Sequence, residues 1–102
     1  MIVELERHRD RIIGACRRNG VARLHLFGSA LRADYRPDAS DVDLLVELQP
    51  MAPEARVDAY FGLLEELRQI FGERVDLVMT GAVKNRWIAR EIERTKRLLY
   101  AA

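Results

Sequence analysis

The chain has few of the features that would indicate a secreted, membrane-bound or strongly charged protein. Its single cysteine, Cys16, makes an internal disulfide bond impossible. No stretch approaches the roughly 18 consecutive apolar residues of a membrane span, and the charges throughout residues 1–20 argue against a signal peptide. Seventeen basic and sixteen acidic residues nearly cancel, so overall charge does not indicate nucleic-acid or membrane binding. We expect a cytoplasmic protein that binds neither nucleic acids nor membranes.

The 102 residues, 49% hydrophobic and 32% charged, have the size and balance of one domain spanning 1–102. Their hydrophobic periodicity alternates between helical and strand spacing, which predicts an α/β fold. The expected helices are 2–19, 57–71 and 83–100, and the expected strands are 22–27, 41–48 and 74–79. Gly20 and Gly72 are expected to end the first two helices. A loop at 49–56 is expected between the strand at 41–48 and the helix at 57–71.

Helical spacing also predicts which side chains are buried. Cys16 shares an apolar helical face with Ile12 and Ile13, so a core position is favoured over a reactive thiol. The helix at 57–71 is expected to bury a stripe formed by Tyr60, Phe61, Leu63, Leu64, Leu67, Ile70 and Phe71. The last helix is expected to bury Trp87, Ile88, Ile92 and Leu99, with an exposed Trp87 that anchors a partner as the alternative.

Two aspartates share one face of the strand at 41–48. A period of two places Val42, Leu44, Val46 and Leu48 on one face and Asp41, Asp43, Leu45 and Glu47 on the other. Carboxylates at such positions start about 6.6 Å apart and can bind two divalent cations about 3.5–4 Å apart. Without a cation they repel each other, and Mg²⁺ prefers such hard oxygen ligands. Asp76 can supply a third carboxylate if its strand pairs beside this one.

A Gly-Ser pair follows the strand at 22–27. Gly28 lets a phosphate approach the backbone, and Ser29, expected as the N-cap of a short helix, adds a hydroxyl. A polar loop at 36–40 with Pro37 follows. Alone, the Gly-Ser pair reads as an ordinary turn and the aspartates as solvent-facing residues. Together they favour a site for phosphoryl transfer, whereas Val46, at the position where an EF-hand needs glycine, excludes that calcium loop.

These segments carry a family resemblance over nearly the whole chain. "FGSALRADYRPDASDVDLLVEL", "RVDLVM" and "IAREIERTKRLLYAA" together resemble the minimal nucleotidyltransferase family, the small branch of the DNA polymerase beta-like nucleotidyltransferases. The family pattern is matched by Gly28, Ser29, Asp41, Asp43 and Asp76. One departure is visible, because Arg32 is followed by Ala33 where the family often has glycine.

The resemblance implies a small mixed β-sheet flanked by helices, with a nucleoside triphosphate and two Mg²⁺ ions at one edge. Asp41 and Asp43 would bind both metals, and Asp76 would bind the catalytic one and help to activate the attacking hydroxyl. Gly28 and Ser29 would bind the β and γ phosphates, and Arg32 is a further expected nucleotide-binding residue.

For a chain of this size the resemblance implies an antitoxin that transfers AMP from ATP to a HEPN-domain toxin. Two alternatives stand beside this reading. The chain could neutralise its partner by contact without catalysis, or it could modify a small molecule such as an aminoglycoside. The missing acceptor-binding domain disfavours the small-molecule reading.

Overall fold

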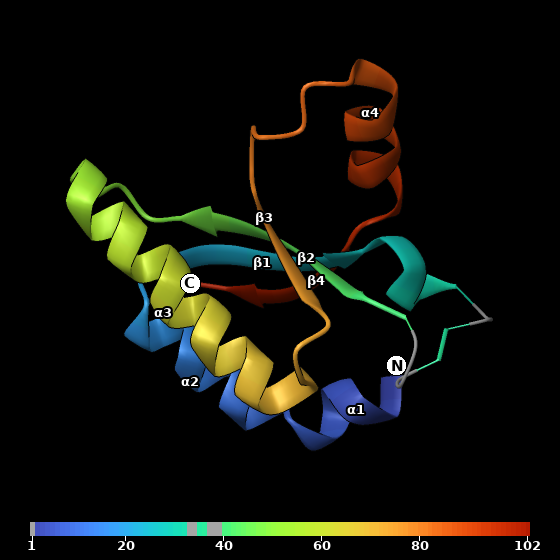
Figure 1. Cartoon of the computed structure of the whole chain (residues 1–102), viewed down its shortest axis with the longest axis horizontal. Coiled ribbons are helices and arrows are strands. Elements are labelled where there is room, and N and C mark those ends of the chain that lie inside the picture. The colour runs from blue at the N-terminus through green and yellow to red at the C-terminus, as the bar shows by residue number, and fades with distance from the viewer. Residues whose placement is uncertain (1, 33–34, 37–39) are drawn as a thin grey trace.

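The computed structural model of the chain describes residues 2–32, 35–36 and 40–102. Its centre is a four-stranded sheet in the order β3-β2-β1-β4 (Figure 1). The strands are β1 (Val21–Phe27), β2 (Val42–Leu48), β3 (Val75–Met79) and β4 (Arg97–Ala101). β1 is antiparallel to β2 and to β4, whereas β2 and β3 are parallel. The expected α/β class with a mixed sheet is therefore confirmed.

Three helices, α1 (Ile2–Arg7), α2 (Arg9–Arg18) and α3 (Pro53–Phe71), lie on one side of the sheet (Figure 1). The main core lies between them and the sheet. It includes Ile12, Ala15, Cys16, Leu24, Leu26, Leu44, Val46, Leu63, Leu67 and Leu77. Cys16 is fully buried, as predicted, and burial raises the pKa of its thiol to about 12. A thiol with that pKa stays protonated and unreactive at neutral pH.

The first two predicted helices differ from the structure at their ends. The helix expected over 2–19 is interrupted at His8, whose backbone leaves helical geometry at φ −106° and ψ 13°. α3 begins at Pro53 instead of residue 57, because proline suits the first position of a helix, so half of the expected loop is helical. Gly72 ends α3 as predicted. Phe61, expected in the buried stripe, is 60% exposed and packs edge-to-face on Tyr60 at 5.1 Å.

The helix predicted over 83–100 is wrong in its second half. α4 spans Arg86–Thr95, and the residues after it form β4 along the free edge of β1. Pairing with β1 satisfies backbone groups that an isolated last turn of helix would leave to water. A run of three apolar residues, Leu98 to Tyr100, fits either spacing, so the sequence pattern alone does not decide between them.

α4 lies on the side of the sheet opposite to α2 and α3 (Figure 1). Ile92 is its buried residue, and with Leu45 it lies outside the main core. Trp87 is 77% exposed and Ile88 is 54% exposed, so the prediction that they are core residues is wrong. In the part of the chain that the structure describes, no helix has both the length and the apolar character needed to cross a membrane.

The Gly-Ser pair forms a short 3-10 helix, η1 (Gly28–Leu31). Ser29 is not its N-cap, because Phe27 occupies that position and the helix starts at Gly28 itself. The Ser29 hydroxyl instead donates to the carbonyl oxygen of Asp41, at 2.9 Å. Ala33, Pro37 and most of the loop expected around Pro37 lie outside the described residues.

Candidate active site

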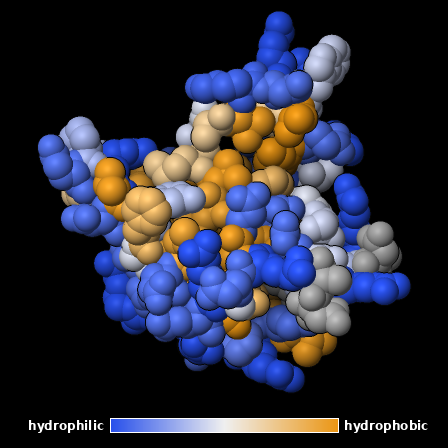
Figure 2. Space-filling model, viewed as in Figure 1, coloured by the Kyte–Doolittle hydropathy of each residue, from blue (hydrophilic) through white to orange (hydrophobic). Residues whose placement is uncertain are grey.

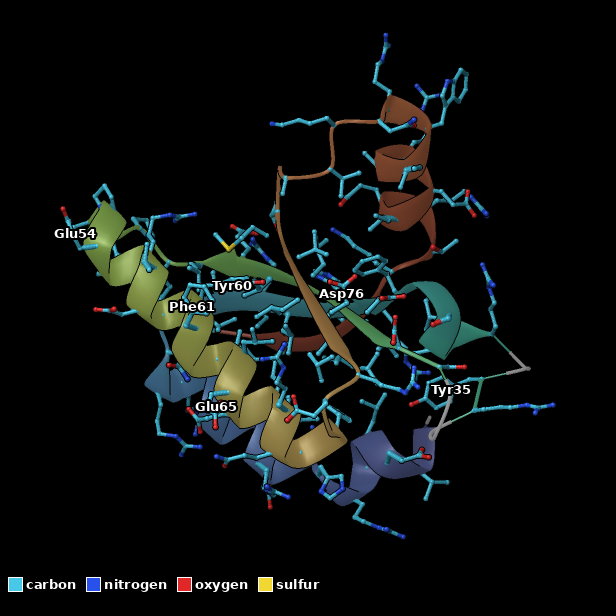
Figure 3. The ribbon with its side chains drawn as sticks, viewed as in Figure 1. Tyr35, Glu54, Tyr60, Phe61, Glu65 and Asp76 are labelled. Atoms are coloured by element: carbon cyan, nitrogen blue, oxygen red, sulfur yellow. The ribbon has the colours of Figure 1, made fainter. Side chains whose placement is uncertain are left out.

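Sheet pairing brings the predicted carboxylates to one place. Asp43 of β2 is the register partner of Asp76 on β3 and of Phe27 on β1, so the three residues share the face that α2 and α3 leave uncovered. Asp41 lies two residues before Asp43, directly ahead of β2. Figure 3 shows Asp76 on β3, where this strand runs beside β2. The condition set for Asp76, that its strand pair with the aspartate-bearing one, is met.

Asp43 is the carboxylate in the least favourable surroundings. It is partly buried, and that burial is the main cause that raises the pKa of its carboxyl above the ordinary value. The Asp76 and Asp41 carboxylates raise the Asp43 pKa further, against the Ser29 amide, which lowers it by hydrogen bonding. At neutral pH this group is therefore a charge that a cation would stabilise.

Gly28 and Ser29 lie against the two aspartates. Gly28 has φ +69°, and a Cβ atom there would collide with the Asp43 carboxylate, so only glycine fits without displacement. The Ser29 amide donates to Asp43 Oδ2 at 3.4 Å. The turn and the start of β2 are thus held together directly, which places a backbone without a side chain beside the carboxylates.

Arg74 is a site residue that the sequence interpretation missed. Its Nη1 lies 3.7 Å from Asp41 Oδ1, and both side chains are more than half exposed. The Val42 amide donates to the Arg74 carbonyl at 2.7 Å, which places Arg74 beside Asp41 across the strands. The signal was available, because parallel pairing of Asp43 with Asp76 puts residue 74 opposite residue 41.

Arg32 lies at the other end of the turn. Its amide closes η1 by donating to the Ser29 carbonyl at 3.0 Å, and its side chain is exposed. It borders a groove of about 390 Å³ between η1 and α4, which begins at Gly28. Leu31 and Ile88 line the same groove and were not expected at the site, because Ile88 was predicted to be buried.

The three aspartate carboxylates are ligands of the kind that divalent cations bind, although in this structure they do not converge on one point. In residues 2–32, 35–36 and 40–102, no three His, Cys, Asp or Glu side chains are close enough to bind one ion as they stand. Asp41 and Asp76 are exposed, so their carboxylates can change rotamer at low cost, while Asp43 is held between them. Carboxylate oxygens around an uncompensated charge are the ligands that Mg²⁺ prefers.

Comparison with known proteins agrees with this geometry. The family described as "Nucleotidyltransferase domain" matches residues 9–99. A Methanocaldococcus jannaschii protein described as a candidate protein adenylyltransferase is 36% identical over 72% of this chain and 70% of its own length. The protein adenylyltransferase MntA of Thermococcus cleftensis is 37% identical over 67% of this chain and 65% of its own length.

Solved structures share the fold. A toxin-antitoxin crystal structure with AMP-PNP superimposes with a TM-score of 0.65 at 22% identity, over 92% of this chain and 73% of that one. A tri-AMPylated HEPN toxin of Shewanella oneidensis in complex with an MNT antitoxin gives a TM-score of 0.57 at 21% identity, over 96% of this chain and 73% of that one. By its family match over residues 9–99 and by its similarity to these relatives, the chain belongs to the nucleotidyltransferase domain family.

Proposed function

We propose that this chain is a Mg²⁺-dependent protein adenylyltransferase and an antitoxin, which transfers AMP from ATP to a hydroxyl group of a HEPN-type toxin. The observation that carries the proposal is the meeting of Asp41, Asp43 and Asp76 with the Gly28–Ser29 turn on one uncovered face of the sheet. Both curated relatives bear adenylyltransferase names, which supports the same reaction.

The three carboxylates would hold two Mg²⁺ ions, with Asp41 and Asp43 shared between both and Asp76 on the catalytic ion. Bound Mg²⁺ would supply charge neutralisation for the phosphates and acidify the attacking hydroxyl. Gly28 would let the triphosphate approach the backbone, and Ser29 would donate to a phosphate oxygen after its hydroxyl turns away from Asp41. Arg32 would add positive charge beside the phosphates.

The reaction is an in-line displacement at the α-phosphorus. The acceptor oxygen forms a bond to phosphorus, the bond from phosphorus to the β-phosphate oxygen breaks, and pyrophosphate leaves. Asp76 would accept the hydroxyl proton, directly or through water, because it is the exposed carboxylate of the three that lies on the neighbouring strand. Asp43 would stay ionised as a ligand.

The proposed partner rests on the relatives and on the surface of this chain. The structures with the same fold are toxin-antitoxin complexes, one with AMP-PNP and one with an AMPylated HEPN toxin. Displacement needs the acceptor hydroxyl within about 3–3.5 Å of the α-phosphorus, and the exposed Asp41 and Asp76 leave the proposed site accessible to a second protein. We therefore assign the acceptor to a separate protein.

The test is to purify the chain with whatever protein is encoded beside it, add Mg²⁺ and ATP, and analyse that protein by mass spectrometry. The proposal requires an AMP adduct on the partner that is lost with chelator and with Asp41→Asn, Asp43→Asn. Calorimetry on the chain gives a second readout. If ATP binds equally well with chelator and to the double variant, the two-metal assignment is wrong.

Neutralisation by contact is the second candidate function. It is favoured by one observation, that Trp87 is 77% exposed on α4, where it can anchor a protein partner. The two candidates differ in stoichiometry, because an enzyme silences many partner molecules and a contact inhibitor silences only those it binds. Partner activity measured with a small fraction of wild-type chain, with and without ATP, separates them.

A further inference from the structure

The two edges of the sheet differ in how their backbone groups are used. β3 and β4 are the edge strands, and on β3 the outward carbonyls already have partners. The Tyr60 hydroxyl donates to the Leu77 carbonyl at 2.6 Å, and the Ala82 amide donates to the Met79 carbonyl at 3.0 Å. Figure 2 shows apolar surface over α3 that continues toward β3. The chain itself therefore closes much of the β3 edge.

The outer edge of β4 has backbone groups to spare. The Ala102 amide donates to the Ala22 carbonyl at 2.9 Å, and Tyr100 pairs with β1 in the same register. Backbone directions alternate along a strand, so the amide and carbonyl of Ala101 point away from β1. Leu99 lies in a register shift and has no partner on β1. Among the described residues, no element other than β1 bonds to the backbone of β4.

The side chains at this edge are apolar as well. Leu98 is 54% exposed, and with Leu99 it borders a recess of about 200 Å³ against α1 and α2. Arg97, at the first position, is the one charged residue of β4. An exposed strand with unpaired backbone groups and apolar side chains is a surface to which another strand adds readily.

We infer that β4 pairs antiparallel with β4 of a second copy of this chain, which joins the two sheets into one. The inference goes beyond the proposed function and stands without it. With the two-fold axis at Tyr100, Leu99 lies opposite Ala101 of the copy, and the outward backbone groups of each bond those of the other.

A second copy is the occupant because β4 is complementary to itself in this register. The two Tyr100 rings meet at the axis, and each large Leu99 side chain lies opposite a small Ala101. Arg97 lies beyond the paired residues, so no two positive charges face each other, whereas a register centred on Arg97 opposes them. The pairing uses the β4 edge alone and leaves the carboxylates of both copies uncovered.

Sedimentation equilibrium over about 10–500 µM chain measures the association. Leu98→Lys places a charge on the edge, and Ala101→Pro removes an outward amide that β1 does not use. Each is expected to raise the dimer dissociation constant about tenfold or more. Val57→Lys is the matched control, because Val57 is 56% exposed on α3 near the other edge, and it is expected to leave the constant unchanged. Circular dichroism checks that each variant folds, and either β4 variant decides alone if the other does not.

An introduced cysteine gives a second, positive readout. Cys16 is fully buried and its thiol has a pKa of about 12, so a new exposed cysteine is the reactive one. Tyr100→Cys is expected to form a disulfide between copies under mild oxidation, because directly opposed residues lie within disulfide range. Phe61→Cys, at a position 60% exposed on α3, is expected to stay reduced.

A wild type that stays monomeric at about 500 µM overturns the inference. A dimer that survives in the folded β4 variants also overturns it, and so does a dimer lost with Val57→Lys alone, which places the interface on α3. A dimer whose Tyr100→Cys variant forms no disulfide overturns the register. Loss of the dimer in the β4 variants, with Val57→Lys unchanged and the Tyr100→Cys disulfide formed, supports it.

Discussion

Asp43 is a residue whose charge lowers the stability of the fold while serving the proposed function. Its carboxylate is partly buried with two like charges beside it, and the Ser29 amide compensates for only part of that. A residue that served folding alone would be apolar or neutral here. Sites that bind metals or reactants commonly retain such destabilising charges, because the bound ligand provides the charge compensation that the folded chain alone does not.

Asp43→Asn is therefore expected to raise the free energy of unfolding while it abolishes AMP transfer. The raised pKa of Asp43 means that its contribution is most favourable at low pH and is lost as the pH rises through that pKa. The gain of the variant over wild type should thus grow from pH 4 to pH 7 and reach about 0.5–1 kcal/mol. Denaturant unfolding with chelator present measures it. A less stable variant at pH 7 would contradict the prediction.

Gly28→Ala is expected to destabilise the fold by about 1–3 kcal/mol and to abolish transfer. Part of the cost is the positive φ, and part is the collision of the new Cβ with the Asp43 carboxylate. Gly72→Ala is the matched control, because Gly72 has φ +93° but open space around the added Cβ. It should lose stability and keep transfer. Equal loss of transfer in both variants would show that strain alone explains the effect.

Asp76→Asn is expected to lower the rate of transfer far more than the affinity for ATP, because Asp76 is assigned to the reacting hydroxyl. Single-turnover rates and calorimetry separate the two quantities. Asp58→Asn, on α3 at the opposite side of the sheet, controls for a general effect of losing a carboxylate. Equal losses of rate and affinity would place Asp76 among the ground-state ligands.

Among the secondary-structure elements, β1, β2 and β3 agreed with the sequence, and the last helix did not. Asp41 and Asp43 could be placed on one face of β2 because strand periodicity is strict, and their partnership with Asp76 needed only one correct pairing. Leu98 to Tyr100 join the sheet because β1 has a free edge, which local periodicity does not reveal. Asn85, whose side chain accepts from the Trp87 and Ile88 amides, marks the start of α4 and was an available signal.

An ion pair joins the C-terminal end of α2 to α3. Arg18 donates to Glu66 Oε1 at 2.5 Å and 2.9 Å, and Asn19 donates to Oε2 at 2.7 Å. The Arg18 hydrogen bonds are the main cause that lowers the pKa of Glu66, and the Asn19 hydrogen bond lowers it as well.

Glu66→Gln is therefore expected to cost about 0.5–1 kcal/mol of stability at pH 7, a small value because Arg18 is mostly exposed. A lowered pKa makes this contribution complete above the ordinary glutamate pKa of about 4.3. It disappears as the pH falls through the lower pKa of the folded state, so wild type and variant should converge in acid. Urea unfolding at several pH values measures this, with Glu65→Gln as the control. A difference that persists in acid would mean that the ion pair is not its cause.

At the scale of the whole molecule, the sheet has one covered and one uncovered face. α1, α2 and α3 build the core on the first, and the second carries the carboxylates, the groove and α4 (Figure 1). This division leaves the proposed reaction site open to a second protein. Trp87 lies on the same side, 77% exposed with the Arg90 guanidinium 5.6 Å from its ring centre. Exposed aromatic residues with a neighbouring arginine are common anchors of protein interfaces.

We therefore expect one variant to lose modification of the partner but keep binding, and another to lose binding of the partner but keep binding of ATP. Asp41→Asn, Asp43→Asn should still co-purify with the HEPN-type partner and leave it unmodified, because the carboxylates contribute chemistry and little contact area. Trp87→Ala should keep ATP affinity and weaken the complex about tenfold or more, because it removes a large exposed apolar surface.

Co-purification, mass spectrometry of the partner and an assay of the partner's toxicity give three independent readouts for each variant. If the double aspartate variant fails to bind, the carboxylate face is part of the interface and the separation of roles is wrong. If it binds and still silences the partner at equal stoichiometry, neutralisation by contact replaces AMP transfer as the mechanism. If it binds without silencing, while the wild type silences only in the presence of ATP and Mg²⁺, the chain neutralises its partner by catalysis.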